Sequence, residues 1–221
     1  MAAPVRPHPP EPGPHARPMT LEQFLAWEET QRRRHEFVDG RPRAMTGSTL
    51  RHNVIAGNVY SALRPAARRA GCQAYMSDVQ VLTPSGRVYY PDVVVRCGVY
   101  APGERQARTP CLIVEVTSPS TRDIDVTEKL DAYRSVPSVR MYLIVEQAVR
   151  RIQVHARLDD GTWTEWEASD ASGASEVATP CVDVVLTLDA VYEDTDIFPP
   201  PDLRAGAPRP AADGADDDVL P

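Results

Sequence analysis

Lysine is almost absent from the sequence. Of the 24 basic residues 23 are arginine, and Lys129 is the only lysine in the 221 residues. The near-total use of arginine, together with 22 prolines, indicates a compositional bias of the source. Arginine and lysine are not interchangeable where the charged group is buried or reactive. A lysine retained against this bias therefore indicates a task that arginine cannot perform.

Long apolar runs and cofactor motifs are also missing. No segment reaches the roughly 18 apolar residues of a membrane span, and the N-terminus lacks the apolar stretch of a signal peptide. The sequence contains neither G-x-G-x-x-G nor a phosphate-binding loop, which argues against a nucleotide cofactor. We therefore expect a soluble, cytoplasmic protein without a membrane partner.

The cysteines show no recognisable spacing. Cys72, Cys97, Cys111 and Cys181 form neither a C-x-x-C motif nor a cysteine–histidine pattern. Such spacings are the usual sign of a zinc site, and the sequence does not suggest a disulfide framework either. We expect reduced thiols.

Charge is distributed unevenly. The net charge is −7, which by itself argues against a nucleic-acid partner. Residues 19–110 carry 13 Arg against 8 Asp and Glu (+5), whereas residues 111–200 carry 7 Lys and Arg against 17 Asp and Glu (−10). The basic half fits either solvated helix faces or a nucleic-acid surface. The acidic half fits either metal-binding carboxylates or a charged surface.

Composition predicts one folded domain between two tails. Residues 1–18 and 199–221 are rich in proline and are expected to be disordered. Residues 19–198 hold the apolar segments of a domain with a real core. A capping box at Thr20 predicts a helix to about residue 33, Asp39-Gly40 predicts a two-residue hairpin turn, and a second helix is expected over about 50–70.

The second half of the domain predicts a crossover between parallel strands. A strand over 112–117, a helix over about 126–135 with Asp125 as its N-cap, and a strand over 140–145 follow one another closely. Such a strand–helix–strand unit has parallel strands and a right-handed connection. Further strands are expected over 74–83, 88–96, 151–156 and 163–167, with a short helix near 188–192. The predicted class is mixed α/β, with a central mixed sheet flanked by helices.

Two carboxylates lie in segments that should be buried. Asp92 opens an apolar strand after Pro91, and Glu115 lies inside the run Leu112–Val116. A buried carboxylate is costly unless it is paired, protonated or bound to a metal. Asp92 could instead be a turn residue, and Glu115 could belong to a buried ion pair. By strand alternation Ile113, Glu115 and Thr117 share one face.

Lys129 lies on the apolar face of its predicted helix. Val126, Lys129, Leu130 and Tyr133 recur at helical spacing, so the ammonium is directed towards the sheet and towards Glu115. A desolvated lysine can lower its pKa, which arginine cannot do. The alternative is an aliphatic stem that packs while the ammonium reaches solvent.

These residues resemble the PD-(D/E)XK nuclease signature, and the ordered set resembles the Uma-type restriction endonuclease family. The matching segments are Met19–Phe24, His35–Gly40, Arg51–Asn53, Tyr90–Val95, Ile113–Thr121, Asp125, Lys129–Leu130 and Tyr133. The resemblance implies a restriction-endonuclease-like core, a homodimer, and Mg²⁺ or Mn²⁺ held by Asp92, Glu115 and the Val116 carbonyl. Thr117 stands where the signature has lysine, so Lys129 would supply the amine from the neighbouring helix.

Other polar residues are weaker candidates. Glu36 corresponds to an extra acid of the superfamily, and it could ligate a second metal, orient Lys129 or simply pair with an arginine. Asp78 could face the same cleft, but it is expected at the surface. His52 at a helix start could bind phosphate or cap the helix, and a structural role is expected. Tyr133 is expected in the core.

Three functions are compatible with the sequence. The first is a metal-dependent endodeoxyribonuclease that hydrolyses DNA phosphodiesters with Asp92, Glu115, Lys129 and Glu36. The second is a catalytically weak nucleic-acid-binding protein of the same fold, because Thr117 breaks the motif and the net charge is negative. The third is a structural or partner-binding protein in which Glu115 and Lys129 form only a buried ion pair.

Overall fold

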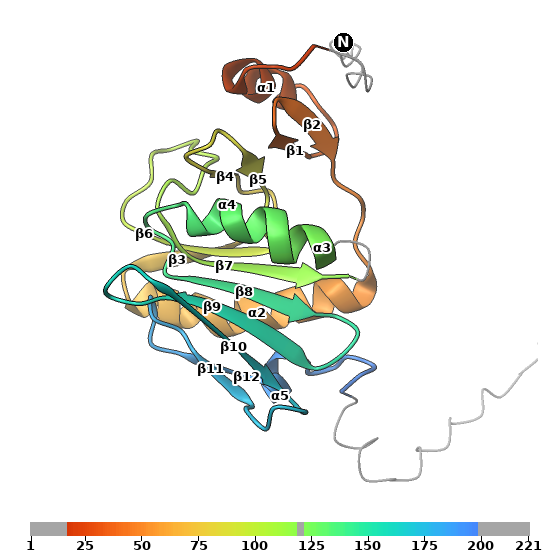
Figure 1. Ribbon diagram of the computed structural model, residues 1–221, viewed down its shortest axis with the longest axis vertical. Coiled ribbons are helices and arrows are strands. Elements are labelled where there is room, and N and C mark those ends of the chain that lie inside the picture. Colours follow the sequence, from red (N-terminus) through yellow and green to blue (C-terminus); the bar gives the residue numbers. More distant parts are fainter. Residues whose placement is uncertain (1–16, 119–121, 199–221) are drawn as a thin grey trace, which may run out of the picture.

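The computed structural model describes residues 17–118 and 122–198. Most of the two predicted tails, residues 1–16 and 199–221, lies outside the described residues. A six-stranded sheet forms the centre of the molecule, with helices on both faces (Figure 1). The predicted mixed α/β class, with a central mixed sheet flanked by helices, is confirmed.

The central sheet has the order β10-β9-β8-β7-β6-β3. Its strands are β3 (Cys72–Met76), β6 (Val93–Cys97), β7 (Pro110–Thr117), β8 (Met141–Glu146), β9 (Arg151–Arg157) and β10 (Trp163–Ser169). Strands β7 and β8 pair in parallel, and every other pair in this sheet is antiparallel. The predicted crossover between parallel strands is therefore confirmed. The helical segment between β7 and β8 packs on one face of the sheet.

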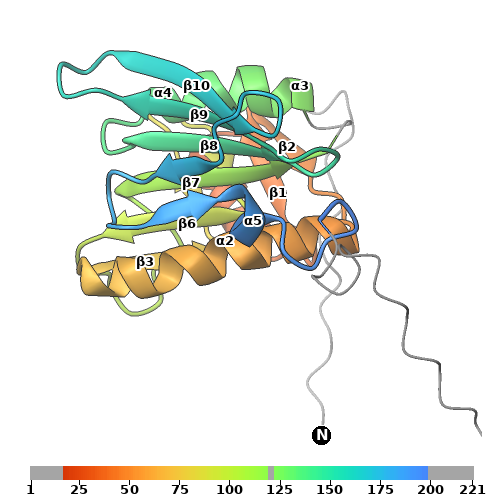
Figure 2. The same ribbon diagram turned by 90° about the horizontal axis from the view of Figure 1, so that it is seen from below.

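Two apolar layers enclose this sheet (Figure 2). Helix α2 (Leu50–Arg69), helix α5 (Leu188–Val191) and the hairpin of β11 (Glu176–Ala178) and β12 (Val185–Thr187) cover one face. Helix α4 (Leu130–Arg134) covers the other face. Strand alternation sends Leu112, Val114 and Val116 to the α2 side and Ile113 to the α4 side. Glu115, two residues after Ile113, therefore lies under α4.

A smaller sheet stands above the α4 layer (Figure 1). Its order is β2-β1-β5-β4, with β1 (His35–Val38), β2 (Arg41–Ala44), β4 (Val81–Leu82) and β5 (Val88–Tyr89). The predicted hairpin turn is confirmed, since Val38 pairs with Arg41 and both Asp39 and Gly40 have positive φ. Helix α1 (Leu21–Glu28) begins with the predicted capping box and packs Phe24 on Phe37.

Several predicted boundaries were wrong for local backbone reasons. The strand predicted over 74–83 is broken, because Ser77 and Asp78 both take positive φ of about 51° between β3 and β4. The strand predicted over 88–96 is interrupted at Pro91, which cannot donate to a strand ladder. The first helix ends at Glu28, and Asp125 lies inside the third helical segment instead of capping it.

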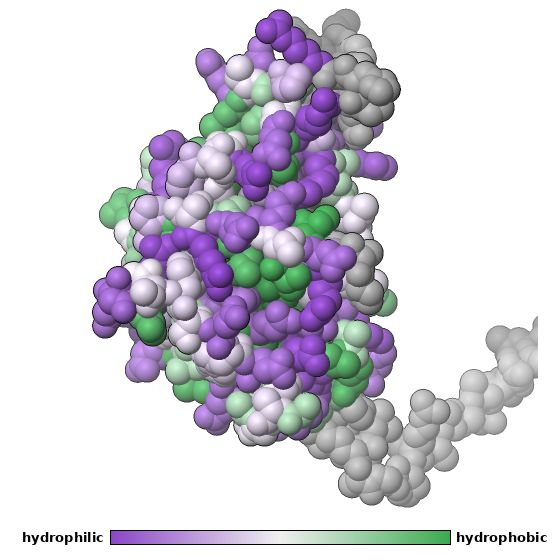
Figure 3. Space-filling view, in the orientation of Figure 1, coloured by the Kyte–Doolittle hydropathy of each residue, from purple (hydrophilic) through white to green (hydrophobic). Residues whose placement is uncertain are grey.

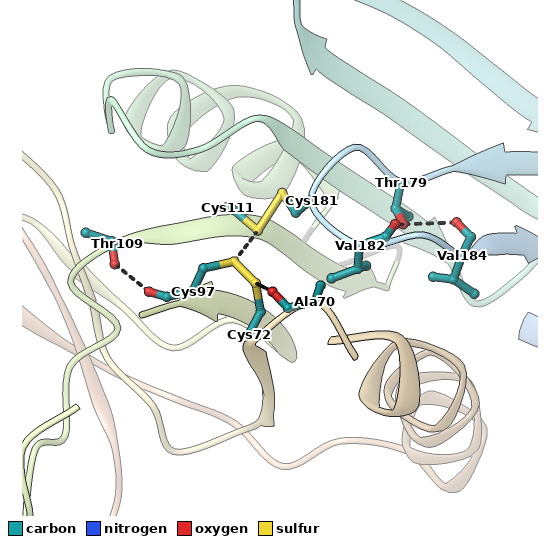
Figure 4. Close-up of a disulfide and its surroundings, with 9 residues drawn as sticks. All are labelled: Ala70, Cys72, Cys97, Thr109, Cys111, Thr179, Cys181, Val182 and Val184. Atoms are coloured by element: carbon teal, nitrogen blue, oxygen red, sulfur yellow. Dashed lines mark hydrogen bonds between the residues drawn. A yellow bond between two sulfur atoms is a disulfide. The ribbon is translucent and has the colours of Figure 1, made fainter. Parts of the chain in front are cut away.

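The expectation of reduced, unpaired cysteines was also wrong. Cys72 and Cys97 form a disulfide between paired residues of β3 and β6, and Cys111 and Cys181 form a second one that ties β7 to the loop before β12 (Figure 4). The Sγ atoms of Cys97 and Cys111 are 4.0 Å apart. These partners are 25 and 70 residues apart in the chain. Strand register brings Cys72 to Cys97, and tertiary packing brings Cys111 to Cys181, so no local spacing could reveal either pair.

The visible surface is mainly hydrophilic, with small apolar groups (Figure 3). Within the described residues, no helix combines the length and the apolarity that crossing a bilayer requires. Isolated apolar side chains such as Leu50 and Val99 are exposed, which is ordinary for a folded domain.

Candidate active site

Strand register brings the two predicted carboxylates together. Strands β6 and β7 pair Val93 with Val114, so the preceding residue of β6, Asp92, stands beside the following residue of β7, Glu115. The Val116 backbone N–H donates to Asp92 Oδ2 at 2.7 Å, which ties the two strands at this point. Both carboxylates line a cleft of about 470 Å³ between the two sheets and the start of α2.

Lys129 lies in the same cleft, surrounded by three carboxylates. Its Nζ is 3.0 Å from Glu115 Oε1, 3.0 Å from Glu36 Oε1 and 3.4 Å from Asp125 Oδ1. Its side chain is only 9% exposed. The prediction that the ammonium points inwards, towards Glu115, agrees with this geometry.

Asp125 and Lys129 are the first and last residues of a π-helical turn. Residues Asp125–Lys129 form a π-helix between α3 (Arg122–Ile124) and α4. Positions four apart are neighbours on a helix, and Asp125 and Lys129 are both buried. Such single-turn insertions occur frequently at functional sites.

Burial and charge shift the protonation of the central pair. Burial is the largest influence on Glu115 and raises its pKa well above the ordinary value; the neighbouring Asp125, Asp92 and Glu36 raise it further, and Lys129 opposes them. Burial alone would lower the pKa of Lys129, but Glu115, Glu36 and Asp125 outweigh burial and raise that pKa well above its ordinary value. Desolvation can lower the pKa of a lysine, but here three acids surround the ammonium and outweigh it.

Glu36 is held between two cations. Its Oε2 accepts two hydrogen bonds from Arg43 on the adjacent strand, at 2.7 and 3.1 Å, and its Oε1 faces Lys129. Arg43 also donates to both oxygens of Glu128, one residue before Lys129. Of the alternatives for Glu36, the arginine pair and the contact with Lys129 are therefore both present. Arg43 had no signal in the sequence beyond its place in a charged strand.

His52 contacts the other side of Asp92. It lies in the first turn of α2, and its Nε2 is 3.2 Å from Asp92 Oδ2. Burial tends to lower the pKa of His52, but Asp92 and the Val116 backbone outweigh burial and raise that pKa above its usual range. His52, for which the sequence predicted a structural role, therefore lines the cleft itself.

The remaining sequence candidates are divided between the site and the surface. Tyr133 is fully buried, and its hydroxyl donates to Glu115 Oε1 at 2.8 Å. Thr117 is buried at the end of β7. Asp78 lies outside the cleft, exposed and paired with Arg34. Asp125 was assigned only to helix capping, although its spacing to Lys129 could have pointed to the site.

The donor set fits a small hard cation. In the described part of the chain, Asp92 Oδ1 and Glu115 Oε2 accept no hydrogen bond, so each carboxylate keeps one oxygen for a ligand. Over these residues no group of three or more Asp, Glu, His and Cys side chains is arranged as a metal site. Two carboxylates and a backbone carbonyl match Mg²⁺, which keeps several waters and takes one or two carboxylates.

Comparison with known families shows which family this chain belongs to. The family model described as "Uma2: Putative restriction endonuclease" matches residues 21–189, which include Glu36, Asp92, Glu115 and Lys129. The chain belongs to the Uma2 family. The family resemblance inferred from the sequence is thereby confirmed.

Two curated relatives and a solved structure are also similar to this chain. The curated relatives include "Uncharacterized protein slr1290" of Synechocystis, which is 34% identical over 159 residues, covering 69% of this chain and 82% of that protein. A second Synechocystis protein, "Uncharacterized protein sll1609", is 27% identical over 149 residues, covering 66% and 84%. A crystal structure titled as a putative nuclease belonging to DUF820, from Anabaena variabilis, shares the fold with a TM-score of 0.65 at 16% identity, covering 79% of this chain and 98% of that one.

Proposed function

We propose that this Uma2 protein is a metal-dependent endodeoxyribonuclease that hydrolyses DNA phosphodiester bonds. The observation that carries the proposal is the juxtaposition of Asp92, just before β6, with Glu115 on β7; both line the cleft, and Lys129 lies beside Glu115. The family description and the nuclease title of the solved structure support the same reaction class.

The residues divide the chemistry between them. Asp92, Glu115 and the Val116 carbonyl would hold Mg²⁺ or Mn²⁺, which supplies Lewis acidity and lowers the pKa of a bound water. Lys129 would orient the attacking water or neutralise charge that develops on the phosphate. Glu36 and Asp125 hold the Lys129 ammonium in place. Tyr133 fixes Glu115 by donating to Oε1 and so leaves Oε2 for the metal.

Charge balance explains why such a cleft needs a divalent cation. Glu36, Asp92, Glu115, Asp125 and Glu128 all line the cleft or contact its residues, whereas Lys129 and Arg43 are the permanent cations among them. A DNA phosphate brings further negative charge. A divalent ion between Asp92 and Glu115 would offset the repulsion that otherwise opposes binding.

The test is cleavage of supercoiled and linear DNA in Mg²⁺, Mn²⁺ or EDTA. Wild type is compared with Asp92→Ala and with Asp159→Ala, which alters a carboxylate with a side chain that is 97% exposed. We expect metal-dependent cleavage by wild type and Asp159→Ala, and none by Asp92→Ala. Equal cleavage by all three would indicate a contaminant and overturn the proposal.

A different outcome would favour the second candidate. Thr117 occupies the position where the signature has lysine, so the site depends on Lys129 alone for its amine. Binding of DNA without cleavage in any metal would assign the protein to nucleic-acid binding. Cleavage of RNA but not of DNA would change the substrate and keep the site.

The homodimer and the cytoplasmic location remain predictions. Light scattering of the purified protein tests the homodimer.

A further inference from the structure

The start of α2 is fixed against the end of β8 beside the cleft. The side chain of Thr49, the N-cap, accepts a hydrogen bond from the His52 backbone N–H and donates to Gln147 Oε1 at 2.8 Å. Arg51 donates to the Gln147 carbonyl at 3.1 Å. The position of His52 is therefore set by contacts that do not involve the carboxylates of the site.

His52 and Val116 act on the same oxygen of Asp92. His52 Nε2 is 3.2 Å from Asp92 Oδ2, and the Val116 N–H donates to that oxygen at 2.7 Å. The Val116 hydrogen bond and the His52 contact on the same oxygen restrict the rotation of the carboxylate. Asp92 Oδ1 is then the oxygen left for a ligand, because it accepts no hydrogen bond within the described residues.

The other ring nitrogen shows that His52 is poorly suited to bind a metal directly. His52 Nδ1 is buried and has no hydrogen-bond partner in the described part of the chain. A histidine that ligates a metal normally donates its second N–H to an orienting carboxylate or carbonyl. His52 lacks that partner, and its Nε2 is directed at a carboxylate oxygen that already accepts another hydrogen bond.

We propose that His52 is a positioning residue that holds Asp92 Oδ2 through its Nε2–H and so presents Asp92 Oδ1 to the divalent cation. The inference rests on the proposed function, since it concerns the same site. It brings a residue of α2 to the support of Asp92. A residue that orients a metal ligand raises the affinity of the site for the metal. Loss of such an orienting residue typically lowers that affinity about 10–100-fold.

Two amide substitutions form a matched test. In His52→Gln the side-chain nitrogen reaches about as far as Nε2, whereas in His52→Asn it reaches only about as far as Nδ1. Mn²⁺ and Mg²⁺ binding is measured by titration calorimetry without DNA, so the readout does not depend on cleavage. We expect His52→Gln to bind Mn²⁺ within about 3-fold of wild type and His52→Asn to bind it about 10–100-fold more weakly.

Stability and spectroscopy separate positioning from other roles. Chemical unfolding in EDTA shows whether each variant folds. If His52→Asn does not fold, the test rests on His52→Gln alone. A loss of Mn²⁺ affinity above 10-fold in His52→Gln overturns the inference. Equal affinity of wild type and His52→Asn also overturns it. Pulsed electron spin resonance of bound Mn²⁺ is expected to show no ¹⁴N coupling from His52, and a coupling that disappears in His52→Gln would show direct ligation instead.

The same titration distinguishes the two proposals. If wild type binds neither cation, the metal dependence of the proposed function fails, and the inference about His52 fails with it. If wild type binds the cation and both amide variants bind equally well, only the role of His52 is wrong.

Discussion

The Lys129 ammonium lies 3.0 Å from Glu115 Oε1, although the two residues are 14 positions apart and belong to a helix and a strand. The contact closes a chain of opposite charges that runs from Glu128 through Arg43 and Glu36 to Lys129. The single lysine of the protein is therefore a cation that three buried carboxylates share.

Replacing Lys129 by Met is expected to destabilise the protein by about 3 kcal/mol at pH 8, because removing one partner leaves buried charges without compensation. The pKa of Lys129 is raised, so its contribution is fully present below its ordinary value of 10.5 and is lost only as pH rises through the higher folded value. The loss in the variant should shrink towards pH 5, where the carboxylates take up protons. Urea unfolding at the two pH values measures both effects.

A double variant supplies the control. Lys129→Met combined with Glu115→Gln should regain much of the lost stability, because one of the stranded charges is removed. The single variant should lose cleavage and retain DNA binding. A Lys129→Met protein that cleaves at the wild-type rate would exclude the role proposed for the ammonium.

Arg43→Lys is expected to weaken both stability and cleavage. The guanidinium makes four hydrogen bonds to Glu36 and Glu128, and an ammonium cannot reproduce this planar fork. Arg43 is about one-third exposed, so the loss of stability should be limited to about 1 kcal/mol. Arg41→Lys, an exposed position on the same strand, is the matched control and should stay within about 0.5 kcal/mol of wild type. Indistinguishable melting curves for the two variants would contradict the prediction.

Reduction of the disulfides is expected to lower stability. Loop closure over separations of 25 and 70 residues predicts losses of about 3.5 and 4.4 kcal/mol for Cys72–Cys97 and Cys111–Cys181. Unfolding with and without a phosphine reductant measures the sum, and the Cys72→Ser/Cys97→Ser and Cys111→Ser/Cys181→Ser variants separate the two bonds. Alkylation of the native, unreduced protein should label no cysteine. Four labelled thiols would show that the chain keeps its cysteines reduced.

His155 should make the protein less stable in mild acid. Burial and Arg134, which donates to Nδ1 at 3.0 Å, lower the pKa of His155, and the exposed Glu165 only partly opposes them. Its folded pKa lies below the unfolded value of 6.5, so stability is complete above that pH and falls as pH drops through the folded value. His155→Gln should lose less stability than wild type between pH 7 and pH 5 in thermal unfolding. Parallel pH curves for the two proteins would refute this assignment.

Sequence patterns predicted the elements with long periodic signals and the residues with unusual burial. The parallel crossover, the Asp39-Gly40 hairpin and helix α2 follow from periodicity and turn chemistry alone. Asp92 and Glu115 could be selected because burying a carboxylate in an apolar strand is costly unless it is paired, protonated or bound to a metal. Lys129 could be selected because it is unique and lies on an apolar face.

What the sequence could not predict depends on pairing between distant segments. Cys72 meets Cys97 through strand register, and His52 meets Asp92 because α2 crosses the sheet near β6. The sequence did not predict the π turn either, because the residue types of Asp125–Lys129 do not distinguish a π turn from an α turn. Each of these features is fixed by tertiary packing.

The pairing of β6 with β7 has a consequence for how such sites vary between proteins. Asp92 and Glu115 are neighbours because Val93 faces Val114, and the residues that loop between the strands do not enter this relation. Insertions or deletions between residues 98 and 109 should leave the two acids adjacent, whereas a slip of one residue in the ladder would send Glu115 to the opposite face of the sheet. The distance between the two acids along the chain is therefore free to change during evolution, while their alignment across the ladder is not.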